Sequence, residues 1–341
     1  MAAPRDRLNG EPDDGAARRP RRRRRGAVGC AGLLFAVVSV VVGCRITGTD
    51  GITPVPQLLA FLPWLLVPTG LGLALTLRGR WLPGGVWGVV LLGLLAWSIE
   101  PYGTVRTPTG TAVAGLRVLT ANVQFGRATD ALVTVVRAEH PSVVFVAECE
   151  EHCRATLLEE IGAGYPYRQA VAASGSRGSL ILSTFALRGT RGVPGTMGMP
   201  GAIADVRGNP VRLQLAHPVP PLPGRVALWR RELDRLRAFA AVDPHTPTIL
   251  AGDFNASQDH AAFRRILDTG LQDAAHLTAD RTPTWPARTT PTLGVQIDHI
   301  LVSADRFAAT RVRFPHLSGT DHRAVLANLT LYAPRTASGR P

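Results

Sequence analysis

The sequence of 341 residues lacks lysine altogether, and only 6% of its residues are aromatic. All 38 basic residues are therefore arginine, and the abundance of alanine, glycine and proline indicates a GC-rich coding sequence. A sequence pI near 11.1 consequently overstates functional basicity, and a net charge of +13 does not by itself indicate a nucleic-acid partner. The length allows one sizeable globular domain together with a further segment.

Charged side chains are missing from three apolar segments, residues 26–44, 55–77 and 82–99. A membrane-spanning helix needs about 20 such residues to cross ~30 Å of hydrocarbon, so we predict three transmembrane helices within residues 26–100. The alternatives are a cleaved signal peptide for the first segment and buried core helices for the others. An apolar signal region is typically shorter, about 7–15 residues, and is not followed by two further spans. Pro56, Pro63 and Pro68 predict kinks in the second span.

The arginines are concentrated ahead of the first span, where residues 1–25 hold nine Arg against four acidic residues. This stretch has no apolar periodicity, so we expect a disordered polybasic tail that stays cytoplasmic and contacts anionic lipids of the inner leaflet. Three spans would then place everything from about residue 101 at the outer face of the plasma membrane. Residues 101–115 are rich in Pro, Gly and Thr and indicate a linker.

Short apolar runs alternate with helical patterns after the linker and show no internal repeat. This alternation of strand and helix patterns predicts one α/β domain over residues 116–332, followed by a disordered tail at 333–341. The predicted strands are residues 116–123, 142–148, 179–184, 201–206, 211–217, 248–254, 296–303 and 322–331. The predicted helices are residues 129–140, 153–161, 226–242 and 258–268.

Most of these strands end in a polar residue that suits phosphate or metal chemistry. Asp and Asn are depleted from strands, so their repeated presence calls for a reason other than folding. Strand ends and their loops converge at one rim of a sheet, which would bring these residues together. They are Asn122, Glu148, His217, Asp253, Asn255, Asp298, His299, Asp321 and His322.

The motifs LTANVQ, FVAEC, AGDFNAS, IDHILVS and SGTDHRAVLANL resemble, in this order, those of the endonuclease/exonuclease/phosphatase superfamily. That superfamily includes pancreatic-type deoxyribonucleases, abasic-site endonucleases, sphingomyelinases and inositol polyphosphate phosphatases. The resemblance covers roughly residues 116–331 and identifies the chain as a membrane-anchored bacterial member. It implies a four-layer α/β sandwich, in which two packed mixed sheets are flanked by helices, with the site at one end.

Hydrolysis of a phosphodiester needs a hard divalent cation, an activated water and donors for the transition state. Carboxylate and amide oxygens suit Mg²⁺, and Mn²⁺ is an alternative. Glu148 is the leading metal ligand, with Asn122 and Asp321 beside it. The family pattern agrees for Glu148 and supports the other two less firmly.

Asp253 is the predicted general base, and Asn255, two residues on, is predicted to orient the water or a phosphate oxygen. Alternation along an extended chain places both on the same side while Phe254 packs inward. The competing interpretation is an Asx-type turn that caps a helix beginning near Ser257.

The resemblance implies that Asp298 pairs with His322, so that the carboxylate fixes the tautomer and the ring donates to the phosphoryl group. His217 resembles the other site histidine of the family, although a turn histidine before Pro218 is the plainer interpretation. His299 follows Asp298 but points the other way along the strand, so it is left out of the site.

The cysteines Cys149 and Cys153 depart from the family pattern. Four residues apart on a helix, they lie within reach of a disulfide, while zinc binding together with His152 and free thiols remain open. Cys30 and Cys44 lie in the first span and are expected only to pack.

We expect the substrate to be a phosphate ester, either a nucleic acid or a phospholipid head group. Arg177 and the arginines of residues 225–237 are candidates for phosphate contact, although the latter fit the solvated face of an amphipathic helix. The alternative function is a catalytically silent, membrane-tethered binding or sensor module, against which the intact polar set argues. No obligate protein partner is inferred.

Overall fold

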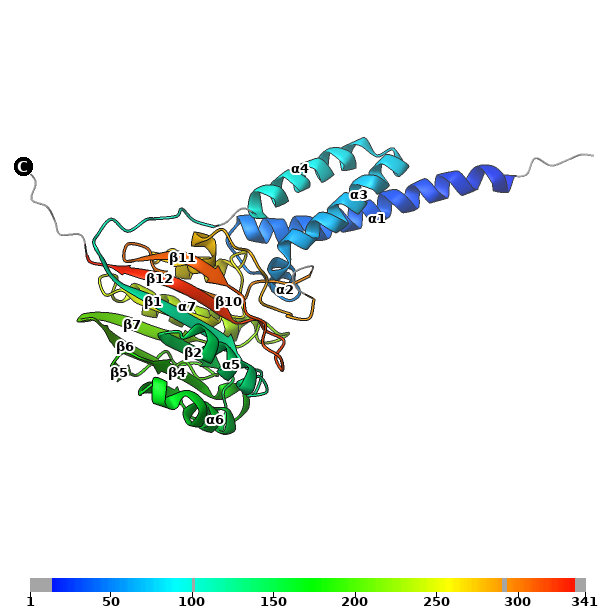
Figure 1. Cartoon of the computed structure of the whole chain (residues 1–341). Helices are drawn as coiled ribbons and strands as arrows, with labels where there is room; N and C mark the ends of the chain where they lie inside the picture. The colour runs from blue at the N-terminus through cyan, green and yellow to red at the C-terminus, as the bar shows by residue number, and fades with distance from the viewer. Residues whose placement is uncertain (1–13, 100–101, 290–292, 335–341) are drawn as a thin grey trace, which may run out of the picture. The chain divides into compact units, whose positions relative to one another are not determined.

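A computed structural model describes residues 14–99, 102–289 and 293–334 (Figure 1). The chain divides into two compact units. One contains Met1–Ile46 and Leu62–Ile99, and the other contains Thr47–Phe61 together with Glu100–Pro341. The first unit is helical, and the second carries both β-sheets.

The helical unit consists of α1 (Asp14–Ile46), the 3₁₀ turn η1 (Leu62–Leu65), α3 (Leu66–Gly79) and α4 (Leu82–Ile99). These three α-helices pack against one another, and small residues make the close approach feasible. A Cβ atom at Gly72 of α3 would lie 2.5 Å from the Phe35 ring of α1, and one at Gly88 of α4 would lie 2.6 Å from it. The buried Phe35 ring therefore depends on glycine in both neighbouring helices.

The prediction of three full-length spans is wrong for the second one. Among the described residues, two helical stretches are long and apolar enough to cross a membrane, Arg22–Ile46 and Leu82–Ile99. The predicted second span breaks into α2 (Val55–Ala60), η1 and the 14-residue α3, and a helix of that length is about 21 Å long. Proline is the physical reason, because it fits the first turn of a helix but not its interior, and Pro56, Pro63 and Pro68 begin or interrupt these pieces.

The expected disordered tail also differs from the structure in part. Residues 1–13 lie outside the described residues, but α1 already begins at Asp14, so residues 14–25 are helical. Arginine has a good helix propensity, and extending a helix that the apolar stretch has already nucleated costs little, although Pro20 lies within this extension.

The second unit contains two six-stranded mixed sheets, as predicted. The first sheet has the order β11-β12-β1-β2-β4-β3, and the second has the order β5-β6-β7-β8-β10-β9. The first comprises β1 (Ala112–Asn122), β2 (Val143–Ala147), β3 (Tyr167–Val171), β4 (Ser179–Ser183), β11 (Phe307–Arg313) and β12 (Val325–Tyr332). The second comprises β5 (Leu187–Thr190), β6 (Gly201–Val206), β7 (Asn209–Ala216), β8 (Thr248–Asp253), β9 (Leu271–Asp273) and β10 (Asp298–Ser303).

The two sheets pack face to face, and helices cover their outer faces. Val143 and Phe145 of β2 belong to the core between the sheets, whereas Val144 and Val146 pack against the helices α5 (Thr129–Glu139) and α6 (Glu151–Ile161). The helices α7 (Val226–Ala241) and α8 (Ala261–Leu267) cover the second sheet. Because β2 is buried on both faces, it reads as an unbroken apolar run. The short helices η2 (Gly162–Gly164), η3 (Gly175–Arg177) and α9 (Ala274–Leu277) lie in the connections.

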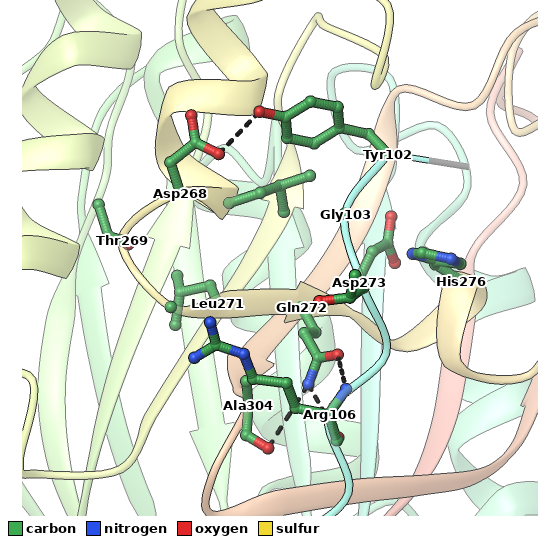
Figure 2. Close-up of a pocket in the computed structure, with 13 residues that line it drawn as sticks. Tyr102, Gly103, Arg106, Asp268, Thr269, Leu271, Gln272, Asp273, His276 and Ala304 are labelled. Carbon is green, nitrogen blue, oxygen red and sulfur yellow. Dashed lines mark hydrogen bonds between the residues drawn. The ribbon is translucent and has the colours of Figure 1, made fainter. Parts of the chain in front are cut away.

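The predicted linker is fixed along part of its length. The Tyr102 hydroxyl donates to Asp268 at 2.8 Å, and the Arg106 backbone N–H donates to Gln272 at 2.7 Å. These contacts border a pocket of about 410 Å³ beside α8 and β9 (Figure 2). The prediction extended the linker to residue 115, but β1 already begins at Ala112, so the linker is shorter than predicted; β12 ends at Tyr332. Most of the predicted C-terminal tail lies outside the described residues.

Candidate active site

Strand ends from both sheets meet at one end of the sandwich. The parallel strands β1 and β2 end at Asn122 and just before Glu148, and the parallel strands β7 and β8 end just before His217 and at Asp253. The strand β10 runs antiparallel to β8 and begins with Asp298, directly opposite Asp253. Asn255 follows β8, and the loop that precedes β12 carries Asp321 and His322, so all eight predicted site residues gather here.

The backbone at this end permits a close approach of the strands. Gly252 precedes Asp253 with φ of +151°, and a Cβ atom there would lie 2.0 Å from the carbonyl oxygen of Ala216. Any other residue would force β7 and β8 apart next to the site. Glu148 itself has φ of +59°, a strained conformation for a residue with a side chain, of the kind that clusters at functional sites.

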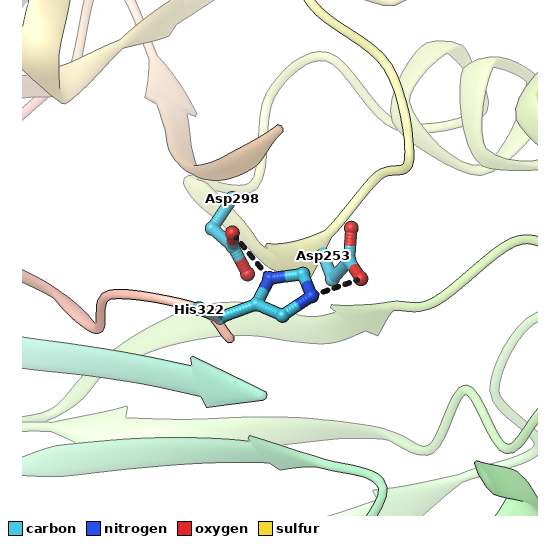
Figure 3. A group of neighbouring side chains, drawn as sticks. All are labelled: Asp253, Asp298 and His322. Atoms are coloured by element: carbon cyan, nitrogen blue, oxygen red, sulfur yellow. Dashed lines mark hydrogen bonds and ion pairs between the residues drawn. The ribbon is translucent and has the colours of Figure 1, made fainter. Parts of the chain in front are cut away.

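His322 lies between two buried carboxylates (Figure 3). Its Nδ1 atom is 2.9 Å from Oδ2 of Asp298, and its Nε2 atom is 3.9 Å from Oδ2 of Asp253. Burial disfavours the imidazolium, but the adjacent Asp298 and Asp253 outweigh it and raise the pKa of His322 to about 10. Burial, aided by the Asp298 charge, raises the pKa of Asp253 to about 7. His322 is therefore an imidazolium at neutral pH, and Asp253 is poised to exchange a proton.

Asn122 connects this group to Glu148. Its Nδ2 atom donates to Asp253 at 3.1 Å and lies 3.3 Å from Oε1 of Glu148. The other Glu148 oxygen, Oε2, accepts from the backbone N–H of Phe125 at 3.2 Å. Burial raises the pKa of Glu148, Asn122 and the charged His322 oppose the rise, and the Asp321 charge adds to it. Glu148 and Asp321 are therefore close enough to repel each other.

Asp321 is the most exposed of the site carboxylates. Its Oδ2 atom accepts from the indole N–H of Trp285 at 2.9 Å, and its Oδ1 atom is 4.0 Å from Nε2 of His322. The predicted site residues did not include Trp285. It stands in a loop rich in Pro and Thr, where an isolated tryptophan was the only available signal.

His217 is buried and aims at the site with its ring nitrogens unpaired. Neither nitrogen has a hydrogen-bond partner within the described part of the chain, and Nε2 is 3.7 Å from Oε1 of Glu148. Burial, reinforced by the charge of His322, lowers the pKa of His217 to about 3, so the ring is neutral. Burying a polar group without a hydrogen-bond partner costs free energy. The unpaired nitrogens of His217 therefore indicate a ligand-binding role rather than that of a turn histidine.

Asn255 takes part in a turn as well as in the site wall. Its backbone N–H donates to Oδ1 of Asp253 at 2.8 Å, and its Nδ2 atom donates to the carbonyl of Pro218 at 3.0 Å. An Asx-type turn is thus present, but it caps no helix at Ser257, because α8 begins at Ala261. Phe254 packs into the core, as alternation predicted.

His299 lies outside this group, as expected from the pleat. Its Nδ1 atom is 2.6 Å from Oδ2 of Asp273, and its Nε2 atom is 3.0 Å from the carbonyl of Ala256. Both ring nitrogens of His299 are therefore engaged by polar partners outside the site.

Cys149 and Cys153 form a disulfide directly after Glu148. The structure therefore shows the disulfide, and not the zinc site with His152 or the free thiols that the sequence had left open. Cys30 and Cys44 are free cysteines.

The donors at this end fit a hard divalent cation. Four carboxylates face a single imidazolium, because His217 is neutral, so the site carries an excess of negative charge. Their oxygens, with the Asn122 amide, are the ligand types that such cations select. Two places could hold the ion, namely the Glu148 side and the compact group Asp253, Asp298 and His322, whose ligand atoms lie within 4.8 Å of one another.

The model of the Endonuclease/Exonuclease/phosphatase family matches residues 119–322, more than half of the chain. The chain therefore belongs to this family, whose members are divalent-metal-dependent phosphoesterases and nucleases. A comparison with curated protein sequences gave no match.

Solved structures share the fold at low sequence identity. An endonuclease/exonuclease/phosphatase from Beutenbergia cavernae is 21% identical with a TM-score of 0.51, over 64% of this chain and 72% of that one. An AP endonuclease from Archaeoglobus fulgidus is 17% identical with a TM-score of 0.51, over 62% of this chain and 98% of that one. A family protein from Bacteroides thetaiotaomicron is 15% identical with a TM-score of 0.52, over 64% of this chain and 99% of that one.

Proposed function

We propose that the protein is a membrane-anchored, divalent-metal-dependent phosphoesterase that hydrolyses phosphodiester or phosphomonoester bonds. The observation that carries the proposal is the convergence, at one end of the sandwich, of a buried carboxylate, an imidazolium and an unpaired neutral histidine. Folding alone gives no reason to bury Asp253, His322 and His217 side by side. A catalytically silent member would not need to keep all of them.

Glu148, with Asn122 and Asp321, would hold the metal, which is Mg²⁺ or alternatively Mn²⁺. When bound, the cation neutralises negative charge on the phosphoryl oxygens. The compact group of Asp253, Asp298 and His322 is the weaker place for it. The Nδ1 atom of His322 is already engaged by Asp298, and a cation there would have to displace a strongly held proton.

Asp253 serves as the general base. With a pKa raised to about 7, it can accept a proton from water near neutral pH, where a base is most effective. Asn255 shapes the adjoining turn and holds the backbone at Pro218, which keeps the neighbouring His217 in place.

His322 and His217 serve as donors. The His322 imidazolium, fixed by Asp298, donates to a phosphoryl oxygen as charge develops there. His217 is neutral and carries one N–H, for which a substrate oxygen is a suitable acceptor. Asp298 orients His322 and does not itself touch the substrate.

Membrane anchoring is supported by chain connectivity. Thr47–Phe61 and the residues after Ile99 belong to the same compact unit, so if α1 and α4 cross a membrane, both must lie on one side of it. If α1 and α4 cross, the chain returns between them through η1 and the shorter α3. The positive-inside tendency places the arginines in the cytoplasm, and the disulfide suits an oxidising compartment. We therefore propose that the catalytic domain faces outward at the plasma membrane.

The substrate class is either a nucleic acid or a phospholipid head group. Phe125 is an exposed aromatic at the rim, and its backbone contacts Glu148. Arg177 is exposed in η3, two residues from the β4 end of the same rim. Both could contact a base or a head group.

The test uses purified full-length protein in detergent and a panel of DNA, RNA, sphingomyelin, phosphoinositides and a generic phosphodiester, with Mg²⁺, Mn²⁺ or chelator. We expect metal-dependent hydrolysis of at least one substrate, reduced by about 10²–10⁴-fold in Asp253→Ala and strongly reduced in Glu148→Ala. Glu159→Ala, an exposed carboxylate on α6, is the matched control. Full activity in both site variants would refute the assignment.

A further inference from the structure

The segment Thr47–Phe61 looks in sequence like a mere connection between two apolar helices, yet it is part of the catalytic unit. Asp50 is almost fully buried, and its two carboxylate oxygens accept from the backbone N–H groups of Ala261 and Ala262, at 2.6 and 3.1 Å. These are the first two residues of α8. The segment thus provides the N-terminal cap of a helix that lies more than 200 residues later in the sequence.

Further contacts fix the segment along its length. The Pro56 carbonyl lies 2.8 Å from Nε2 of the buried His260, whose Nδ1 atom accepts from the Ser257 N–H at 2.9 Å. Because a carbonyl can only accept, Nε2 of His260 carries the hydrogen. The Gln57 side chain donates to the carbonyl of Pro221, in the loop that follows His217.

The end of the segment touches the loop that carries Trp285. The rings of Phe61 and Trp285 lie with their centroids 6.4 Å apart at an interplanar angle of 57°, a favourable tilted contact. Trp285 in turn donates its indole N–H to Asp321. One ring contact and one hydrogen bond therefore connect the segment to Asp321, with the Trp285 side chain as the single intermediate.

Asp321 depends on this hydrogen bond more than the other carboxylates depend on theirs. Its side chain is 37% exposed, whereas those of Asp253 and Asp298 are 2% and 1% exposed. The latter two are enclosed by neighbouring side chains, and hydrogen bonds to Asn122, Asn255 and His322 also hold them in place. The Asp321 side chain has no such enclosure, so the Trp285 indole is the contact that restricts its rotamer.

We propose that Phe61 is a positioning residue of the active site, through which the segment Thr47–Phe61 holds Trp285 and thereby sets Asp321 for metal binding. The inference rests on the proposed function in one respect, namely that Asp321 helps to hold the cation. It adds a part of the catalytic machinery that lies outside the residues matched by the family model.

The test measures Mn²⁺ binding by electron paramagnetic resonance on the full-length protein, without substrate. Partners that orient metal ligands contribute about 10–100-fold to affinity when removed. We expect Trp285→Phe, which keeps a ring but loses the N–H, to weaken binding by about 10-fold, and Phe61→Ala to weaken it by about 3–10-fold. Phe61→Leu should retain most of the affinity. Tyr167→Ala, an exposed aromatic in β3 at the opposite end of the strands, is the control.

A double variant tests whether Phe61 acts through Trp285. If it does, Phe61→Ala should have no further effect on Mn²⁺ binding in the Trp285→Phe background, because the hydrogen bond is already lost. Additive effects, or unchanged binding in Phe61→Ala, would overturn the proposal. If thermal unfolding shows that Phe61→Ala does not fold, Mn²⁺ binding is compared between Phe61→Leu and Trp285→Phe instead. The proposal then requires Phe61→Leu to retain most of the affinity and Trp285→Phe to bind about 10-fold more weakly.

The outcomes separate this inference from the proposed function. If no phosphoester is hydrolysed but Phe61→Ala still weakens Mn²⁺ binding, the activity is wrong and the positioning role stands. If hydrolysis is confirmed while Phe61→Ala and Trp285→Phe both leave Mn²⁺ binding unchanged, the function stands and the positioning role is wrong.

Discussion

At the scale of single residues, the site is governed by the charge balance around His322. One imidazolium lies beside two buried carboxylates; the charges of Asp298 and Asp253 raise the pKa of His322, and the charge of Asp298 helps to raise the pKa of Asp253. The Nδ1–H group of His322 already donates to Asp298 and is not available to a substrate. This leaves Nε2 as the only ring atom that can reach a substrate.

The pH dependence of stability follows from the raised pKa of His322. Its folded value of about 10 exceeds the ordinary value of about 6.5, so the stability it contributes is complete below pH ~6.5 and is lost as the pH rises toward 10. We expect the difference in unfolding free energy between the metal-free wild type and His322→Gln to shrink between about pH 7.5 and 10. Denaturant titrations in chelator measure it. A difference that stays constant with pH would contradict the shift.

The convergence of the eight candidate residues could be predicted from the sequence because each lies at or near one end of an apolar strand, in motifs that resemble those of one superfamily. Trp285 could not be predicted as a contact of Asp321. Nothing in a Pro-rich and Thr-rich loop fixes its fold, and the two residues lie 36 positions apart. The unpaired nitrogens of His217 likewise appear only when the surroundings are known.

At the scale of elements, the eight predicted strands are the eight internal strands of the two sheets. The four strands that the sequence did not reveal, β3, β5, β9 and β11, are the four sheet edges. The internal strands β2, β4, β8 and β10 are buried at every residue, and such strands are rich in apolar residues. An edge strand needs less apolar character and carries charged residues, as Arg168 in β3 and Arg188 in β5 do.

The cap provided by Asp50 should be measurable as an element-scale effect. Asp50→Ala leaves two buried N–H groups of α8 without an acceptor, which costs about 1–3 kcal/mol. We expect faster hydrogen exchange in peptides that cover residues 257–267, and a lower unfolding temperature. Asp280→Ala, which removes a local loop contact to Thr282, is the matched control. Unchanged exchange in α8 would show that the cap is dispensable.

The disulfide joins two residues four apart and closes a small loop. Removing it by Cys149→Ser with Cys153→Ser should cost about 2 kcal/mol or less in the chain-entropy model, as measured by guanidinium unfolding. Cys30→Ser with Cys44→Ser serves as the control, because both cysteines are free. Four reactive thiols per unfolded wild-type chain isolated from cells would contradict the bond.

At the scale of the whole molecule, composition predicted the division into apolar helices and an α/β domain. It did not predict the boundary, because the prolines divide the second apolar segment and Thr47–Phe61 joins the other unit. The number of apolar residues in a segment measures its hydrophobicity, but it does not show which part of the chain the segment packs against.

Topology is tested by labelling intact cells with a membrane-impermeant thiol reagent. In a background lacking Cys30 and Cys44, Val242→Cys, at an exposed position of the catalytic domain, should react without permeabilisation. Arg80→Cys, at the exposed turn between α3 and α4, should react only after permeabilisation, because the proposed topology puts the two positions on opposite sides of the membrane. The reverse pattern would place the catalytic domain in the cytoplasm.

The insertion of Thr47–Phe61 into the catalytic unit bears on how this protein can be shortened or rearranged. A protease that cuts after Ile99 would shed a domain missing its own α8 cap, and a recombinant fragment beginning there would inherit the same defect. The apolar helices and the α/β domain are therefore not independent modules. A homologous domain grafted onto these helices would have to supply a matching seat for residues 47–61.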